Sequence, residues 1–198
     1  MRVVAETVFV VAHLLAIVFS RSDGVLCGAL TKPSYNWEMA RSRFENALEV
    51  VSLLAVAAAI AVVAGSWGVL PDRVPSHFGA TGHPDAYGSK GNVLIPVGLA
   101  VGLYLLFSLV QRLPRRFYNY PVQITASNAD VQYRLAREGL ASIKAVLSVL
   151  VASGTWLTTQ VALGQRNGLG SWFVPAVLLS VLLLAASYAR AAYRKRNA

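Results

Sequence analysis

Charged residues are scarce in this chain. Only 14% of its 198 residues are charged and 56% are hydrophobic, with a mean hydropathy of +0.53. A soluble domain usually carries about 25% charged residues. The composition excludes intrinsic disorder, because the chain has ample apolar surface to bury. It also argues against a soluble globule, since so few polar residues cannot cover so much apolar side chain. We therefore predict an integral membrane protein.

Cysteine and acidic residues are also few. The lone Cys27 excludes an intramolecular disulfide and a thiolate metal cluster. Nine acidic residues face 18 basic ones, giving a net charge of +9. Such a charge suggests nucleic acid in a soluble protein, but here the basic residues lie between long apolar runs, as in membrane proteins that contact anionic lipid. We expect no nucleic-acid partner.

Motifs for nucleotide and hydrolase chemistry are missing as well. The sequence has no glycine-rich phosphate loop followed by Lys-Ser/Thr and no Gly-x-Ser-x-Gly element. It also has no cysteine nucleophile in a recognisable context. We therefore assign no catalytic residue, no cofactor and no metal ligand, and we expect a protein without enzymatic activity.

Long apolar runs define the fold. A membrane helix needs about 20 mostly apolar residues, and four segments meet this requirement, namely residues 47–70, 93–113, 143–163 and 172–188. The sequence predicts an all-α, polytopic helical bundle. We divide it into an extension (1–46), a membrane domain (47–165) with loops at 71–92 and 113–140, and a last helix with a basic tail (166–198).

The basic residues predict the orientation. Eleven of them flank one side of the four spans and three flank the other. The positive-inside rule places the eleven in the cytoplasm, so the loops 71–92 and 164–171 face outward and the carboxyl terminus lies inside. We expect a multi-pass protein of a cell membrane.

The amino-terminal segment allows two interpretations. Residues 3–19 are apolar enough for a fifth span, although they contain Glu6 and His13. Alternatively, the natural start is Met39, which gives a short basic cytoplasmic segment before the first span. A cleaved signal peptide fits less well, because cleavage would leave several arginines and lysines outside.

Polar residues concentrate in the loop 71–92, which makes it the best candidate for function. Its prolines and glycines predict irregular, turn-rich backbone, with positive φ at Gly79 and Gly82. The loop 164–171 is short and nearly featureless by comparison. His77, His83 and Asp85 are residue types that zinc accepts, but their spacing matches no known ligand motif. A simpler expectation is that His77 and Asp85 bind loop backbone and that Lys90 pairs with Asp85.

The loop 113–140 has two parts. Residues 114–121 are basic and aromatic, which favours a position along the lipid head groups. Ser127 and Asp130 resemble a capping box that starts a helix, and this helix is expected to continue into the third span for about 35 residues. Its exposed part is either a docking surface for a cytoplasmic partner or an amphipathic segment that faces lipid or packs against the protein itself, and we favour the second; its polar residues are Tyr133, Arg134, Arg137 and Glu138.

Inside the spans, polar groups are expected to serve packing. Lys144 lies at the inner end of the third span and is expected to snorkel toward water. Ser148, Thr155 and Thr159 form a small, polar stripe with Ala152 on the same helix. A Gly98-x-x-x-Gly102 pattern marks the second span. Both patterns predict close contact between helices.

The stretch LPDRVPSHFGATGHPDAYGSKGNVLIP resembles the signature of the DUF1648 family of bacterial integral membrane proteins. The matching residues are Pro71, Pro75, His77, Phe78, Gly82, Asp85, Ser89, Lys90 and Pro96. The block FYNYPVQITASNADVQYRLAREGLASIK resembles a second region of the family, through Asn119, Tyr120, Pro121, Asn128, Tyr133 and Arg134. The resemblance covers about residues 47–165. It implies a membrane domain that also begins SdpI-like proteins, which give immunity to a secreted toxin and hold a repressor at the membrane.

Three hypotheses for function follow. The first is a sensor, immunity-like or partner-binding protein whose loop 71–92, His83 included, binds a peptide, a lipid or a membrane protein, while segment 113–140 contacts a cytoplasmic protein. The second is a membrane enzyme acting on a lipid or cell-wall precursor, with His77 as base and Asp85 orienting it. The third is an accessory subunit of a transporter.

Overall fold

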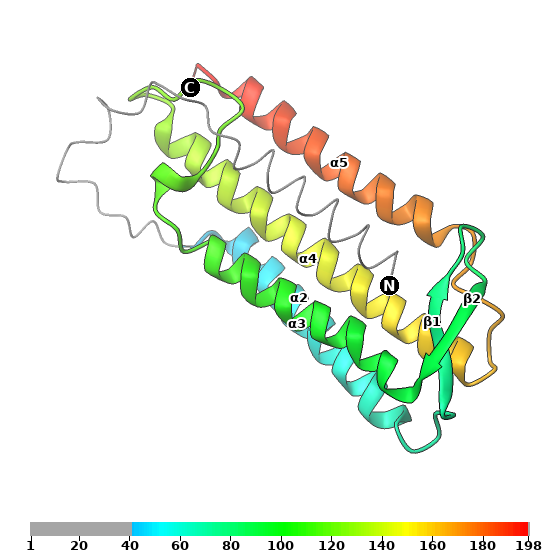
Figure 1. Cartoon of the computed structure of the whole chain (residues 1–198). Coiled ribbons are helices and arrows are strands. Elements are labelled where there is room, and N and C mark those ends of the chain that lie inside the picture. Colours follow the sequence, from blue (N-terminus) through cyan, green and yellow to red (C-terminus); the bar gives the residue numbers. More distant parts are fainter. Residues whose placement is uncertain (1–40, 198) are drawn as a thin grey trace.

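Four long helices dominate the computed structural model, which describes residues 41–197. They are α2 (Arg43–Ser66), α3 (Leu94–Val110), α4 (Ala129–Ala162) and α5 (Phe173–Arg194), and they lie side by side in antiparallel order (Figure 1). Each is long and apolar enough to cross a membrane, α3 together with the 3₁₀ turn before it. The predicted all-α membrane class is confirmed. The possible span at 3–19, Cys27 and Met39 lie outside the described residues.

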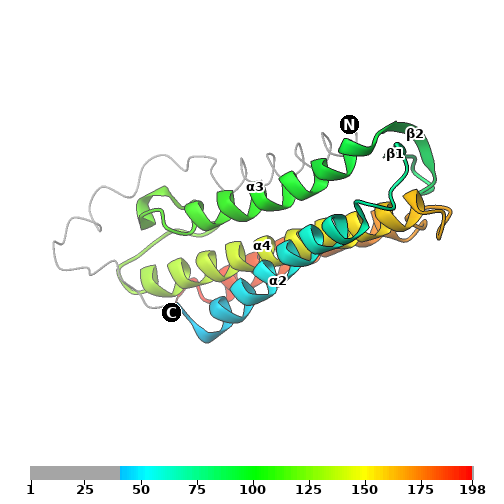
Figure 2. The same cartoon turned by 90° about the horizontal axis from the view of Figure 1, so that it is seen from below.

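Helix α4 is the centre of the bundle. It packs against α2, α3 and α5 and also contacts the strand β1, with α2 and α3 on different sides of it (Figure 2). Its 34 residues make a rod of about 51 Å at 1.5 Å per residue, which exceeds the roughly 30 Å of a hydrocarbon core. The long helix predicted from the sequence is confirmed, and part of it extends beyond the membrane-spanning stretch.

The capping box predicted at Ser127 is wrong. Helix α4 begins after Asn128, which makes no side-chain cap to the helix, and Asp130 pairs with Arg115 of the preceding loop. A capping box does start α2, where Ser42 accepts from the backbone N–H of Glu45 and the Glu45 carboxylate accepts from the N–H of Ser42. The Ser-x-x-Glu pattern before an apolar run is its sequence signal.

Small residues pack α4 as predicted, but those of α3 do not. Ser148, Thr155 and Thr159 are buried, and the two threonine hydroxyls donate to carbonyl oxygens one turn earlier. Gly98 and Gly102 lie in open space, since a Cβ added to either glycine would meet no atom of the described chain within 4 Å. The predicted close approach at this pattern is therefore not made within residues 41–197.

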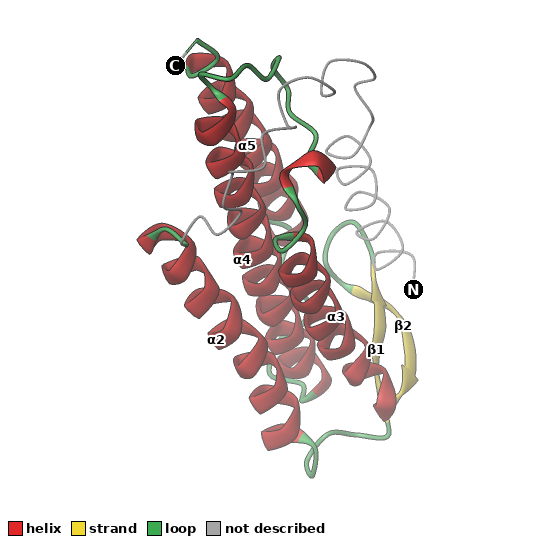
Figure 3. Ribbon diagram, turned by 90° about the vertical axis from the view of Figure 1, so that its left-hand side faces the viewer, coloured by secondary structure: helices red, strands yellow, loops and turns green. Residues whose placement is uncertain are grey.

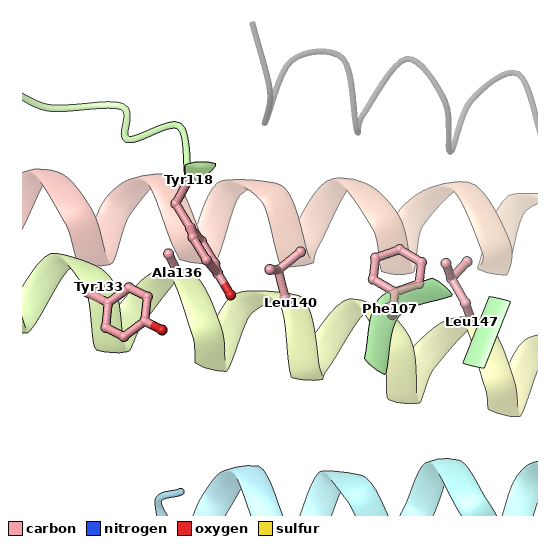
Figure 4. Packing of buried hydrophobic residues seen from close by; sticks show 6 residues of the cluster. All are labelled: Phe107, Tyr118, Tyr133, Ala136, Leu140 and Leu147. Atoms are coloured by element: carbon pink, nitrogen blue, oxygen red, sulfur yellow. The ribbon is translucent and has the colours of Figure 1, made fainter. Parts of the chain in front are cut away.

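Two apolar clusters hold the bundle. The first follows α4 and is built from Phe107, Tyr118, Tyr133, Ala136, Leu140 and Leu147 (Figure 4). The second joins the end of α2 to the loop that follows it, through Val63, Leu70, Val74 and Val93. Val74 and Val93 are 0% and 2% exposed, so the second cluster anchors the loop 71–92 to the helices.

The loop 71–92 is an antiparallel hairpin and not the irregular segment predicted. Strands β1 (Arg73–Phe78) and β2 (Pro84–Ser89) pair from Arg73–Ser89 to Phe78–Pro84, with irregular register around His77. Each strand has one free edge, and prolines are tolerated on such edges because they cannot donate to a ladder. The hairpin lies beside the start of α3 (Figure 3), which the short 3₁₀ helix η1 (Lys90–Val93) precedes. We call this the hairpin end of the bundle.

Candidate functional site

The hairpin brings His77 and Asp85 together. A ring N–H at His77 Nδ1 donates to the carboxylate of Asp85 across the two strands. This corrects the expectation that both residues bind loop backbone and that Lys90 pairs with Asp85. The Lys90 ammonium instead lies 5.0 Å from the ring centroid of Trp67, in a cation–π contact. Asp85 therefore orients the imidazole ring of His77 through Nδ1, which leaves Nε2 as the ring nitrogen that could exchange a proton with a substrate.

The tip of the hairpin rests on the loop between α4 and α5. The backbone N–H of Leu169 donates to the Gly82 carbonyl oxygen over 2.8 Å, and His83 Nδ1 donates to the Asn167 carbonyl oxygen over 3.0 Å. Gly82 has φ +80°, and a Cβ there would lie 2.8 Å from the Gly170 carbonyl oxygen. The loop 164–171, expected to be featureless, is therefore the seat of the hairpin.

Positive φ is confirmed for Gly82 and wrong for Gly79, whose φ is not positive. Gly79 instead closes the tip through backbone bonds with Gly82 and His83. Glycine at 82 is required both by its conformation and by the contact with the seat.

An open groove lies between the hairpin tip and its seat. Its volume is about 520 Å³, and its lining combines Thr81 and His83 of the hairpin with Arg166, Ser171 and Trp172 of the seat. The Arg166 guanidinium lies 5.7 Å from the ring of Trp156. The groove therefore offers a cation, an imidazole and an aromatic ring at the surface.

The remaining candidate residues of the hairpin shape it. Pro75 is buried, whereas Pro71 is exposed at the exit from α2. Ser89 precedes η1 without a side-chain cap. Within residues 41–197, no group of three or more His, Cys, Asp and Glu side chains gathers to hold a metal ion.

At the opposite end, which we call the tail end, Asn128 fastens the last helix. Its Nδ2 donates to the carbonyl oxygens of Gln123, over 3.0 Å, and Arg196, over 2.7 Å. Gln132, one turn later, donates to the carbonyls of Ala192 and Lys195. Carbonyls at a helix end lack intrahelical partners, so these buried amides cap α5. Asn128 was a candidate, but Gln132 was missed.

The aromatic candidates of segment 113–140 form core instead of a docking surface. Tyr133 is 6% exposed and meets Tyr118 edge to face at 5.2 Å. Arg137 is also buried, so around these two residues the segment packs against the protein itself, which was one of the two alternatives, and offers no docking surface. Burial raises the pKa of the Tyr118 and Tyr120 hydroxyls.

Three candidates of this segment differ from the tyrosines. Pro121 and Arg134 are exposed, and Asn119 is half-buried. Arg134 therefore keeps the exposed position predicted for it, while Asn128, Tyr120 and Tyr133 serve packing.

A buried charge cluster at the tail end was not predicted. Lys144 was expected to snorkel, but it is 1% exposed, and its Nζ donates to Glu49 Oε2 over 2.6 Å. The same Nζ reaches Ser108 and Gln111. Glu49 and Lys144 are opposite charges in the apolar runs of two different spans, at similar distances from the span ends. This pattern is the sequence signal that could have predicted their ion pair.

A second ion pair lies beside the first. Arg137 Nε is 2.9 Å from Glu45 Oε1, with Glu45 6% and the Arg137 side chain 11% exposed. Both pairs join α2 to α4. Ionisable groups inside membrane proteins are costly and usually serve function.

A comparison with known protein families matches the part of the chain that contains the hairpin. An uncharacterized protein of Archaeoglobus fulgidus is 35% identical over 84 residues, which cover 38% of this chain and 45% of the relative. The chain thus spans less than half of that relative's length. No solved structure shows a significant match. The family model "Domain of unknown function (DUF1648)" matches residues 53–101, from α2 through the hairpin to α3. Over this stretch, the chain is similar to the DUF1648 family.

Proposed function

We propose that this chain is a non-enzymatic membrane protein that binds a protein or peptide partner at its hairpin end. The groove beside His83 carries the proposal. It is open, and its two walls are fixed to each other by the bonds of Gly82 and His83 to the seat. A preformed concave site with a few polar groups is typical of binding sites. Arg166 and His83 favour a partner that presents an acidic group.

The orientation of the bundle supports this role. The excess of basic residues at the tail end favours a cytoplasmic carboxyl terminus, and in that orientation the groove would face outward. Helix α4 contacts the hairpin through β1 and carries the ion pairs of the tail end. A partner bound outside can therefore act on a rod that reaches inside, as a sensor or immunity-like protein requires.

Site-directed photocrosslinking tests the binding site. A photoreactive phenylalanine analogue replaces Thr81, which lines the groove, or Ala86, which is exposed on the same hairpin away from it. We expect a defined protein adduct from position 81, weakened by Arg166→Gln, and none from position 86. Equal adducts from both positions, or none from position 81 in the folded protein, contradict the proposal.

Labelling tests the orientation. In a background with Cys27→Ser, cysteine is introduced at Ser171 or at Arg194, which are both exposed. A membrane-impermeant maleimide added to intact cells should label position 171 and not position 194. The reverse pattern would place the groove in the cytoplasm.

The His77–Asp85 pair favours a second candidate, a membrane enzyme with His77 as general base. A histidine oriented by a carboxylate is a common arrangement for proton transfer. The pair is partly exposed, so Asp85→Asn should cost less than about 1 kcal/mol of stability. Purified protein is incubated with bacterial lipid and cell-wall precursor extracts, and products are followed by mass spectrometry. Turnover lost in Asp85→Asn but kept in Asp72→Asn would support the enzyme, whereas no turnover by the wild type rejects it.

A further inference from the structure

A polar cavity opens at the tail end, between α2, α4 and the end of α3. Its volume is about 310 Å³. Its lining residues are Arg41, Glu45, Glu49, Gln111, Arg112, Tyr133 and Arg137. Most of them carry charge, which is unusual in a chain with 14% charged residues.

Both carboxylates of the cavity are already neutralised. Glu45 receives Arg137 through two contacts, 2.9 Å from Nε to Oε1 and 3.3 Å from Nη2 to Oε2. Glu49 receives the Lys144 ammonium at 2.6 Å and also accepts from the Tyr104 hydroxyl. Neither carboxylate therefore presents an unbalanced negative charge to the cavity.

Two arginines remain in excess. Arg41 reaches Glu49 only at 3.5 Å, and its side chain is 40% exposed. Arg112 forms no ion pair with any residue in the range 41–197. With Arg137 and Lys144 matched to the two glutamates, Arg41 and Arg112 leave the cavity with a net positive charge that favours an anion.

The two excess arginines also lie at the ends of two membrane-spanning helices, where lipid head groups are expected. Arg41 lies two residues before α2 begins, and Arg112 lies two residues after α3 ends. Next to them, Phe44 and Leu109 expose 53% and 61% of their surface. An anionic group in the cavity can thus be joined to apolar chains that run along the exposed faces of α2 and α3.

We propose that this cavity binds the phosphate head group of an anionic phospholipid. Arg41 and Arg112 pair with the phosphate, while Gln111 and the Tyr133 hydroxyl supply neutral hydrogen bonds at its rim. Basic pockets between membrane helices are known to bind such head groups. The bound lipid would bridge α2 and α3, which pack less extensively against each other than against α4.

Lipid retention tests the proposal. The full chain is purified in a neutral detergent and mixed with equal amounts of phosphatidylglycerol and phosphatidylcholine, and bound lipid is measured by native mass spectrometry. We expect preferential retention of phosphatidylglycerol. In Arg41→Gln/Arg112→Gln, its affinity should fall about 30-fold, since each basic residue contributes about 1 kcal/mol of attraction to the head group and tenfold corresponds to about 1.4 kcal/mol.

A matched control separates this site from general attraction. Arg190→Gln/Arg194→Gln removes the same charge from exposed positions of α5 outside the cavity and should keep wild-type retention. Equal loss in the control, or no preference by the wild type, overturns the proposal. Inorganic phosphate alone is the third arm. If it raises the melting temperature as much as the lipid does, the site takes a free anion and the lipid assignment is wrong.

Discussion

The buried pair of Glu49 and Lys144 gives a quantitative prediction. In Glu49→Gln, Lys144 keeps its contacts to Ser108 at 3.2 Å and Gln111 at 3.1 Å but loses its counter-ion at 1% exposure. Removing one partner of a buried pair costs about 3–5 kcal/mol. We expect a loss in the middle of that range, about 4 kcal/mol, for Glu49→Gln.

Substitution of the other partner, Lys144, should lower the free energy of unfolding by less. In Lys144→Met, the Glu49 carboxylate keeps the Tyr104 hydroxyl and Arg41, and its side chain is 17% exposed. Water and Arg41 can therefore compensate part of the charge, and we expect about 2 kcal/mol. The double variant removes both charges, so its cost should fall below the sum of the single variants by about 1.5–3 kcal/mol.

The assay is equilibrium unfolding in mixed micelles with an increasing fraction of dodecyl sulfate, followed by circular dichroism. Glu138→Gln is the control, because Glu138 lies on the same helix without an ion pair among the described residues. It should change stability by less than about 0.5 kcal/mol. A Glu49→Gln variant as stable as this control, or strictly additive single variants, would refute the reasoning.

Three further predictions concern other parts of the bundle. Gly82→Ala should lower stability by about 1–3 kcal/mol, because φ is +80° and Cβ would meet Gly170, whereas Gly79→Ala should be near neutral in the same thermal-melt comparison. Gln132→Leu removes two bonds to the end of α5 and should cost about 1–3 kcal/mol, seen as faster hydrogen exchange in the last turn. Burial raises the pKa of Tyr118 above its ordinary value of about 10. Stability from this residue is thus complete below about pH 10 and falls as pH rises further, and a melt series from about pH 8 to 12 should show less of this fall in Tyr118→Phe.

Hydropathy was sufficient to find the helices. The predicted spans at 47–70 and 93–113 overlap α2 and α3, because about 20 apolar residues in a row have one stable arrangement in lipid. The length of α4 could also be predicted, since its apolar face continues past the span. The helix boundaries differ from the predicted ones by a few residues where a cap sets the first residue of the helix, as Ser42 does for α2.

The contacts between distant segments could not be predicted. The hairpin alternates poorly because Pro75 and Gly88 interrupt the pattern, so its strands resembled a loop. Gly82 contacts the loop 164–171 through backbone atoms on both sides. Such a contact leaves no side-chain pattern in the sequence. Whether Lys144 snorkels or forms an ion pair depends on how α2 and α4 are rotated about their axes. The hydrophobic periodicity of a single helix does not determine that relative rotation.

The seating of the hairpin has a consequence for the order of assembly. His83 and its partner Asn167 are 84 residues apart in the chain. At a synthesis rate of about 5–20 residues per second, the strands emerge about 4–17 s before their seat exists. During that interval the tip of the hairpin lacks its partners in the loop 164–171, while its base can already contact the end of α2 through Lys90 on Trp67 and through the second apolar cluster. We therefore expect the tip of the hairpin to be more accessible to proteases in a nascent chain that ends before residue 164 than in the complete protein.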